Sequence, residues 1–183
     1  MKRLLCIGDS NTYGYDPRSL IGGRFPESVR WTGRLKASGY DVLNYGQNGA
    51  CIPNRSDLVI DLIKRNLPLD RVVIMLGSND LLEGRSAEET AVRMEQLLWN
   101  LHLGTDVHIL LVCPPPMKRG EWVETDQLVS ESKQLGSLYR KAAQLRDTQF
   151  ADAADWNIDL LFDGVHFSEE GHRAFAQGIT AVL

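Results

Sequence analysis

A serine, a histidine and an aspartate occur in this chain in an arrangement typical of nucleophilic catalysis. Ser10 follows the apolar run 4–7 after a two-residue turn, and Asp163 stands three residues before His166. A serine hydroxyl becomes a nucleophile when an imidazole takes its proton, and an aspartate holds that imidazole in the required tautomer. We therefore predict that Ser10, Asp163 and His166 form a catalytic triad.

Two further polar positions could stabilise the oxyanion that such an attack creates. Oxyanions need hydrogen-bond donors aimed at them, and the predicted donors are the N–H groups of Ser10 and Gly46 and the amide of Asn79. A glycine at position 46 lets the backbone approach closely. Asp9 and Asp80 are predicted to support the site by bonding nearby N–H groups, as short acidic side chains often do.

These residues belong to four short polar segments, and each segment alone is equally typical of a turn or a helix cap. The segments are 8–11, 44–49, 77–80 and 163–166. Three of them directly follow a predicted strand, and the last precedes the final helix. Their common placement at one edge of a sheet favours a shared chemical role, because ligands bind outside the carboxyl ends of parallel strands.

Five apolar runs predict strands, and amphipathic segments between them predict helices. The strands are 3–7, 41–44, 71–76, 107–112 and 150–153, and the helices are 28–38, 55–66, 86–103, 125–145 and a last one after Ser168. The strongest strands are continuously apolar, as strands buried on both faces of a parallel sheet are. The alternation predicts one α/β domain over 1–183, a three-layer sandwich with a five-stranded parallel sheet.

Composition excludes several other classes of protein. The net charge of −4 is spread over intermixed signs, which disfavours a nucleic-acid partner. No apolar run approaches the roughly 20 residues of a membrane span, and the N-terminal apolar stretch stops too early for a signal peptide. Cys6, Cys51 and Cys113 fit neither a disulfide framework nor a metal site. We expect a cytoplasmic protein without metal or cofactor; homo-oligomer formation is left open.

Several residues near the predicted site are expected to line a substrate pocket. They are Tyr13, Asp16, Arg30, Trp31 and Trp122. The irregular segment 114–124, which contains Trp122, has the length of a lid or binding loop. The aromatic side chains favour an apolar acyl or aryl pocket, although packing of the two tryptophans on the sheet explains them equally well.

The four polar segments together resemble the sequence blocks of the SGNH (GDSL-type) hydrolase superfamily, which are esterases on a flavodoxin-like sheet. Segments 8–11, 44–49, 77–80 and 163–166 match its serine, glycine, asparagine and histidine blocks in order, with Asn11 where leucine often stands. Segments 30–33, 67–70, 114–116 and 163–168 are similar to the bacterial arylesterase branch. That resemblance implies hydrolysis of short-chain acyl or aryl esters, in some members with acyl transfer.

Three functions are therefore weighed. The first is a serine esterase that acts on small acyl or aryl esters through an acyl-enzyme, and the second is a carbohydrate O-acetyl esterase with the same groups. The third is a non-catalytic flavodoxin-like module that binds a flavin or nucleotide. The third is disfavoured because the chain has neither glycine-rich phosphate motif, and Asp9 would repel a phosphate.

Overall fold

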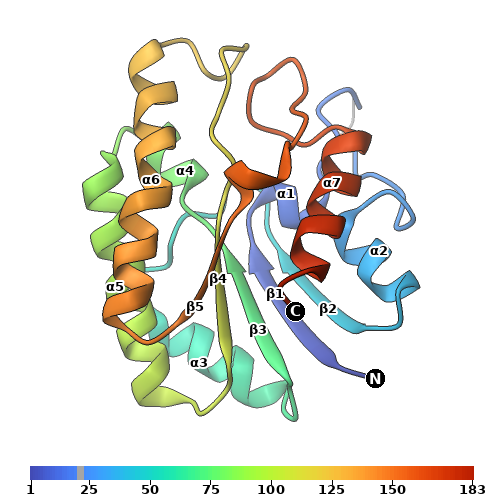
Figure 1. The fold of residues 1–183 in the computed structure, drawn as a ribbon, viewed down its shortest axis with the longest axis vertical. Coiled ribbons are helices and arrows are strands. Elements are labelled where there is room, and N and C mark those ends of the chain that lie inside the picture. Colours follow the sequence, from blue (N-terminus) through green and yellow to red (C-terminus); the bar gives the residue numbers. More distant parts are fainter. Residues whose placement is uncertain (20–22) are drawn as a thin grey trace.

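The computed structural model describes residues 1–19 and 23–183 and contains a five-stranded parallel sheet (Figure 1). The strand order is β2-β1-β3-β4-β5. The strands are β1 (Arg3–Gly8), β2 (Asp41–Gly46), β3 (Arg71–Met75), β4 (Ile109–Cys113) and β5 (Gln149–Asp152). This topology confirms the predicted α/β fold with a five-stranded parallel sheet.

All five predicted helices are present, and the structure adds three short ones. The helices are α1 (Ser10–Tyr13), α2 (Trp31–Ala37), α3 (Ser56–Arg65), α4 (Ser78–Leu82), α5 (Ala87–Gly104), α6 (Asp126–Leu145) and α7 (Glu169–Thr180), with a 3-10 turn η1 (Ala153–Trp156). A capping box formed by Ser86 and Glu89 starts α5. The additions, α1, α4 and η1, each have only four or five residues and no helical periodicity to detect.

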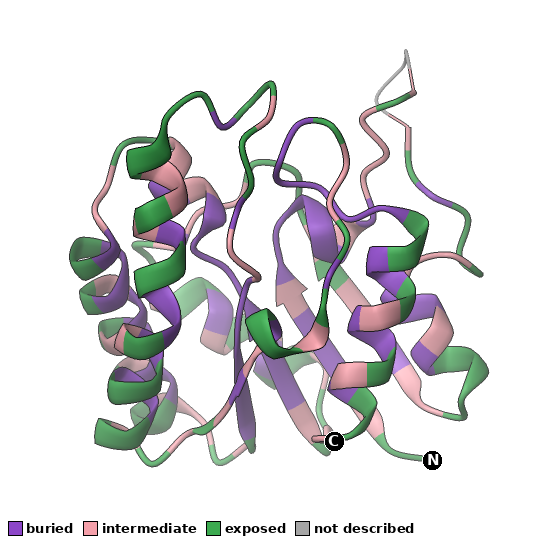
Figure 2. Ribbon diagram, turned by 45° about the horizontal axis from the view of Figure 1, so that its top comes forward, coloured by how far each residue is buried: buried purple, intermediate pink, exposed green. Residues whose placement is uncertain are grey.

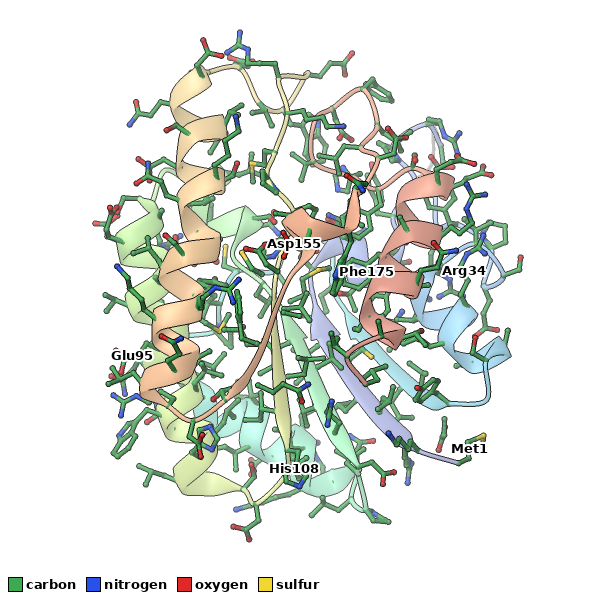
Figure 3. All side chains as sticks on the ribbon, viewed as in Figure 1. Met1, Arg34, Glu95, His108, Asp155 and Phe175 are labelled. Atoms are coloured by element: carbon green, nitrogen blue, oxygen red, sulfur yellow. The ribbon has the colours of Figure 1, made fainter. Side chains whose placement is uncertain are left out.

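Helices cover both faces of the sheet, and the alternation of each strand supplies both cores. Ile74 and Leu111 pack on the side of α3, α5 and α6, whereas Val73 and Leu110 pack on the side of α2 and α7. Phe175 of α7 is fully buried in the second core (Figure 3). Each such buried side chain contributes about 1.5–3 kcal/mol to folding, so the strands are strongly held in place.

The carboxyl ends of the strands carry the connections that matter for chemistry (Figure 1). β1 runs into α1, β3 into α4, and the connections 114–125 and 157–168 lie at the same end of the sheet. Residues 163–168 of the latter are all buried (Figure 2).

Both termini lie at the opposite end of the sheet, where Lys2 Nζ donates a hydrogen bond of 2.9 Å to the backbone oxygen of Leu183. No helix in 1–19 or 23–183 is long and apolar enough to cross a membrane.

Candidate active site

Ser10 is the first residue of α1, directly after β1. Asp9 caps this helix, because its Oδ1 accepts the N–H of Asn11 at 2.9 Å. The helix packs so closely on the strand end that a Cβ at Gly8 would meet Thr12 Oγ1 at 2.1 Å. The strand end therefore presents Ser10 on a short, capped helix at the predicted edge of the sheet.

Ser10, His166 and Asp163 form a continuous hydrogen-bonded chain. Ser10 Oγ lies 2.9 Å from His166 Nε2, and His166 Nδ1 lies 2.7 Å from Asp163 Oδ2. Asp163 Oδ1 accepts the N–H groups of Val165 and His166, each at 2.9 Å. Ser10 is 5% exposed and His166 1% exposed, so these bonds form away from bulk water.

The two buried carboxylates near His166 have pKa values shifted in opposite directions. Burial raises the pKa of Asp163, but hydrogen bonds from the ring and N–H of His166 and the N–H of Val165 outweigh it and hold that pKa below its usual value. Burial raises the pKa of Asp9 to about 6, against the opposing N–H of Asn11 and the field of His166. Asp163 is thus the carboxylate that stays ionised beside the imidazole.

Gly46 and Asn79 lie on the neighbouring strand ends, and both have internal acceptors. A Cβ at Gly46 would meet Tyr13 N at 2.1 Å, so only glycine allows α1 to sit against β2. The Gly46 N–H donates to Asn44 Oδ1 at 2.9 Å, and Asn79 Nδ2 donates to the backbone oxygen of Ala50 at 3.0 Å.

Two aromatic rings flank His166. Tyr15 meets it edge-on with ring centroids 4.9 Å apart, and Trp122 does so at 4.8 Å. Trp122 is 48% exposed, so it presents an aromatic surface to solvent right beside the imidazole.

Comparison with known proteins identifies the family of this chain. A family model described as GDSL-like lipase/acylhydrolase matches residues 6–174. The chain belongs to this family. Its members hydrolyse carboxylic esters, so the chain is a carboxylic ester hydrolase. No curated protein sequence gives a significant match.

Solved structures of similar proteins extend this assignment. A carbohydrate acetylesterase family member from Sinorhizobium meliloti is 31% identical with a TM-score of 0.86, covering 100% of this chain and 97% of that one. A putative arylesterase from Agrobacterium tumefaciens is 28% identical with a TM-score of 0.84, covering 100% and 98%. The M. smegmatis aryl esterase is 26% identical with a TM-score of 0.82, covering 100% of both chains.

In this GDSL hydrolase, a second loop holds the Asp–His segment in place. The N–H groups of Lys118 and Trp122 donate to the backbone oxygens of Gly164 and Asp163, at 3.0 and 3.1 Å. A Cβ at Gly120 would lie 2.4 Å from the carbonyl carbon of Asp163. The loop 118–122 therefore approaches the backbone of the Asp–His segment as closely as glycine permits.

The supporting acid Asp80 ties this hydrolase's glycine segment to α4. It is fully buried, and its carboxylate accepts the N–H of Ile52 at 2.9 Å and Arg93 Nε at 3.0 Å. Asp9 and Asp80 thus both accept backbone N–H groups.

Trp31 does not line a pocket in the structure. Its side chain has no exposed surface, packs against Phe175, and donates from Nε1 to the backbone oxygen of Asn11 at 3.1 Å. The expectation that it contacts substrate is corrected here: the tryptophan lies in the core and fixes the backbone after Ser10. Of the two tryptophans, Trp122 alone reaches the surface at the site.

The other three expected pocket residues lie beyond Ser10 along the chain. Tyr13 lies under the guanidinium of Arg24 at 4.2 Å, Asp16 pairs with Arg18 at 2.9 Å, and the aliphatic part of Arg30 packs on the backbone just after α1. In the described part of the chain, none of these three is hydrogen-bonded to Ser10 or His166.

Two residues near the site, Asn11 and His172, make hydrogen bonds that the sequence motifs do not predict. Asn11 bonds the backbone on both sides of His166, as detailed below. His172 of α7 is fully buried, and its Nδ1 accepts the N–H of Trp31 at 3.4 Å. Burial lowers the pKa of His172 to about 3, with Arg34 and Arg30 adding to the effect, so this ring is neutral. The only sequence signal for Asn11 is its place next to Ser10.

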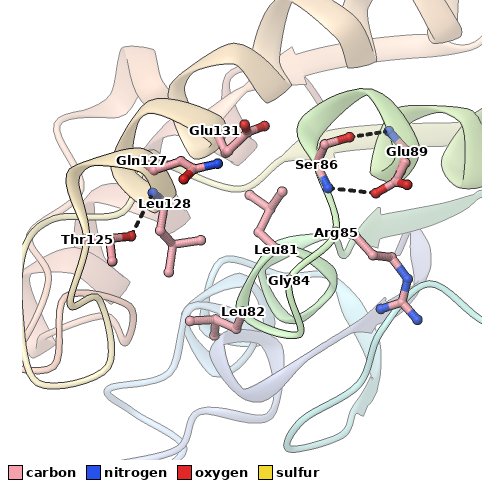
Figure 4. Close-up of a pocket in the computed structure, with 10 residues that line it drawn as sticks. All are labelled: Leu81, Leu82, Gly84, Arg85, Ser86, Glu89, Thr125, Gln127, Leu128 and Glu131. Carbon is pink, nitrogen blue, oxygen red and sulfur yellow. Dashed lines mark hydrogen bonds between the residues drawn. The ribbon is translucent and has the colours of Figure 1, made fainter.

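A cavity of about 440 Å³ lies between α4 and the start of α6, and its lining includes none of Ser10, Asp163 and His166 (Figure 4). Leu82 on its wall stands three residues after Asn79, so the two share a face of α4. The remaining lining combines apolar and charged side chains: Leu81, Gly84, Arg85, Ser86, Glu89, Thr125, Gln127, Leu128 and Glu131.

No group of three or more potential metal ligands occurs in the described residues.

Proposed function

We propose that the chain, as one domain over 1–183, is a serine esterase that hydrolyses small short-chain acyl or aryl esters through an acyl-enzyme on Ser10. The observation that carries the proposal is the chain of hydrogen bonds from Ser10 through His166 to Asp163, at 2.9 and 2.7 Å. The arrangement provides a nucleophile, a base and an orienting carboxylate in contact. The Asn79 amide and the N–H groups of Ser10 and Gly46 are the proposed oxyanion donors.

The reaction follows from these positions. His166 Nε2 takes the hydroxyl proton while Ser10 Oγ bonds to the ester carbonyl carbon, and the carbonyl electron pair becomes the oxyanion. When the oxyanion collapses, the ester C–O bond breaks, and His166 gives its proton to the leaving alcohol. Water then attacks the acyl-enzyme, gives a proton to His166, and releases the acid as Ser10 recovers its proton. An alcohol in place of water would give acyl transfer.

A carbohydrate O-acetyl ester is the second candidate substrate. The 31% identical Sinorhizobium meliloti structure is described as a carbohydrate acetylesterase family member, while the other two structures are described as aryl esterases. The half-exposed Trp122 ring beside His166 is compatible with either class of ester substrate, because an aryl group and the apolar face of a sugar ring both stack on indole.

Ester hydrolysis by wild type and Ser10→Ala tests the proposal. On p-nitrophenyl acetate, p-nitrophenyl butyrate and an acetylated sugar, we expect Ser10→Ala to lose about 10³-fold or more in kcat/KM. Ser86→Ala is the matched control, because it removes the α5 cap far from the reacting groups, at a cost of about 1 kcal/mol in stability, and should keep full activity. Equal activity of Ser10→Ala and wild type would refute the mechanism, and the preferred ester identifies the substrate class.

A further inference from the structure

The side chain of Asn11 spans the backbone on both sides of His166. Its Oδ1 accepts the N–H of Phe167 at 2.9 Å, and its Nδ2 donates to the backbone oxygen of Val165 at 3.1 Å. One amide group thus bonds the residue before His166 and the residue after it. Asn11 is only 3% exposed, so water does not compete for these bonds.

Asn11 is itself rigidly attached to the helix that carries Ser10. Its N–H donates to Asp9 Oδ1 at 2.9 Å, and its backbone oxygen accepts Trp31 Nε1 at 3.1 Å. Because Ser10 and Asn11 are adjacent in α1, any displacement of Asn11 is shared by Ser10. The amide therefore connects the nucleophile's own helix with the His166 segment, which comes from 156 residues further along the chain.

We propose that Asn11 is a positioning residue that sets the distance between Ser10 Oγ and His166 Nε2. The inference rests on the proposed function, since the distance matters only if His166 activates Ser10. The loop 118–122 bonds the His166 segment from another side but has no part in α1, so it cannot align the imidazole with the hydroxyl by itself. Both hydrogen bonds of the Asn11 amide directly join α1, which carries Ser10, to the segment that carries His166.

The chemistry at position 11 makes the proposal specific to an amide. Leucine has the branching and the number of side-chain heavy atoms of asparagine, but it is bulkier and neither donates nor accepts a hydrogen bond. With leucine at position 11, the Phe167 N–H and the Val165 oxygen would lose their hydrogen-bond partner on α1. The His166 segment would keep its bonds to Asp163 and to loop 118–122 but lose these two bonds to the helix that carries Ser10. Shifts of about 1 Å at reacting groups can cost about 10²-fold in rate.

The test compares Asn11→Leu and Asn11→Asp with wild type. Aspartate retains the acceptor for Phe167 but turns a second acceptor toward the Val165 oxygen, so it breaks one bond of the two. Asn100→Leu is the matched control, because it removes an amide that bonds Ser56 Oγ at 2.9 Å between α3 and α5, away from His166. Thermal melts of all variants establish that activity is compared between folded proteins.

We expect Asn11→Leu to lower kcat by about tenfold or more with KM within about twofold, and to slow inactivation of Ser10 by a fluorophosphonate by a similar factor. Inactivation depends on the hydroxyl that His166 activates but not on the substrate's own binding contacts. The control should change neither rate. If Asn11→Leu does not fold, Asn11→Asp is judged by the same criteria.

Two results would overturn the inference. One is a folded Asn11 variant with kcat and inactivation rate within about twofold of wild type; the other is a rise in KM at unchanged kcat, which would make Asn11 a binding residue. Ser10→Ala, measured in parallel, separates the two proposals. Loss of activity in Ser10→Ala with full activity in Asn11→Leu rejects only the role of Asn11, whereas an active Ser10→Ala rejects the proposed function.

Discussion

The two halves of the candidate site differ in what their polar groups are bonded to. On the acid–base side, Ser10, His166 and Asp163 are bonded to one another in the order that proton transfer needs. On the oxyanion side, the Gly46 N–H is bonded to the side chain of Asn44, and the Asn79 amide is bonded to the backbone oxygen of Ala50 in the segment after β2. Folding therefore assembles the acid–base groups in advance. As a proposed oxyanion donor, the Gly46 N–H must exchange its internal acceptor for the substrate oxygen, whereas Asn79 Nδ2 carries a second N–H beside the one that Ala50 accepts.

Asp163→Asn tests the preassembled half and should have the largest effect. The amide would place an N–H₂ or a single oxygen opposite His166 Nδ1, so the imidazole would lose its tautomer and its ionised partner. We expect kcat on p-nitrophenyl acetate to fall by about 10³-fold or more. Asp152→Asn is the control, because its Oδ1 only accepts the Ala154 N–H and an asparagine retains that bond. Retention of kcat in Asp163→Asn would mean that His166 is oriented by other groups.

Asn79→Ala tests the proposed oxyanion half of the site. We expect kcat to fall by about 10²-fold with little change in KM, since an oxyanion donor acts mainly on the transition state. Steady-state kinetics on the same ester provide the measurement. Asn66→Ala, which also removes one amide bonded to a backbone oxygen, at the end of α3, should keep wild-type kcat. A rise in KM alone would instead assign Asn79 to substrate binding.

Gly120→Ala tests how tightly the acid–base half is held from outside. The added Cβ would lie 2.4 Å from the Asp163 carbonyl carbon, so loop 118–122 or the Asp–His segment must shift. We expect kcat to fall by about tenfold. Gly39→Ala is the control: it is strained by its φ of +93° but has open space around it, so it should lower Tm without changing kcat. Equal kcat in Gly120→Ala and wild type would show that the segment keeps its geometry without close contact.

His172 predicts a pH effect on stability rather than on the reaction. Its pKa is about 3 when folded against 6.5 ordinarily, so the unfolded chain binds more protons between these values. Through this group, stability decreases as pH falls from 6.5 toward 3, by up to about 1.4 kcal/mol per pH unit. The raised pKa of Asp9, about 6 against 3.8, has the opposite slope between those values.

The His172→Gln variant isolates this contribution, because glutamine has an oxygen acceptor for the Trp31 N–H and does not titrate. Urea unfolding at pH 4.5 and pH 8 gives the free energy of unfolding of each protein. Relative to wild type, the variant should lose less stability on acidification, while its kcat at pH 8 stays near the wild-type value. An identical pH dependence in the two proteins would contradict the prediction.

The sequence predicts what depends on short-range patterns. Apolar runs identify all five strands, with ends that differ from the observed ones by up to two residues. Asp163 is close enough to His166 in the chain for their pairing to be expected. The rule that ligands bind at the carboxyl ends of parallel strands then brings Ser10 to the same edge. These inferences need only periodicity, spacing and a general rule of topology.

Contacts that depend on the fold itself could not be predicted. The partner of the Asn11 amide is 154 residues away in the chain, and nothing in the local sequence identifies it. Trp31 is amphipathic and lies beside polar residues, so its type is compatible with either a pocket or the core. The acceptor of the Gly46 N–H is the side chain of Asn44, two residues away, but its choice depends on the exact turn after β2. Packing decides each of these cases.

The proximity of the two termini has a practical consequence for protein engineering. Lys2 reaches Leu183 with a 2.9 Å hydrogen bond at the end of the sheet remote from Ser10. A short glycine–serine linker would close the chain there, and new ends opened in 105–108, between α5 and β4, would give a circular permutant. Fusion partners or surface attachment at the existing ends would likewise leave the catalytic edge unobstructed.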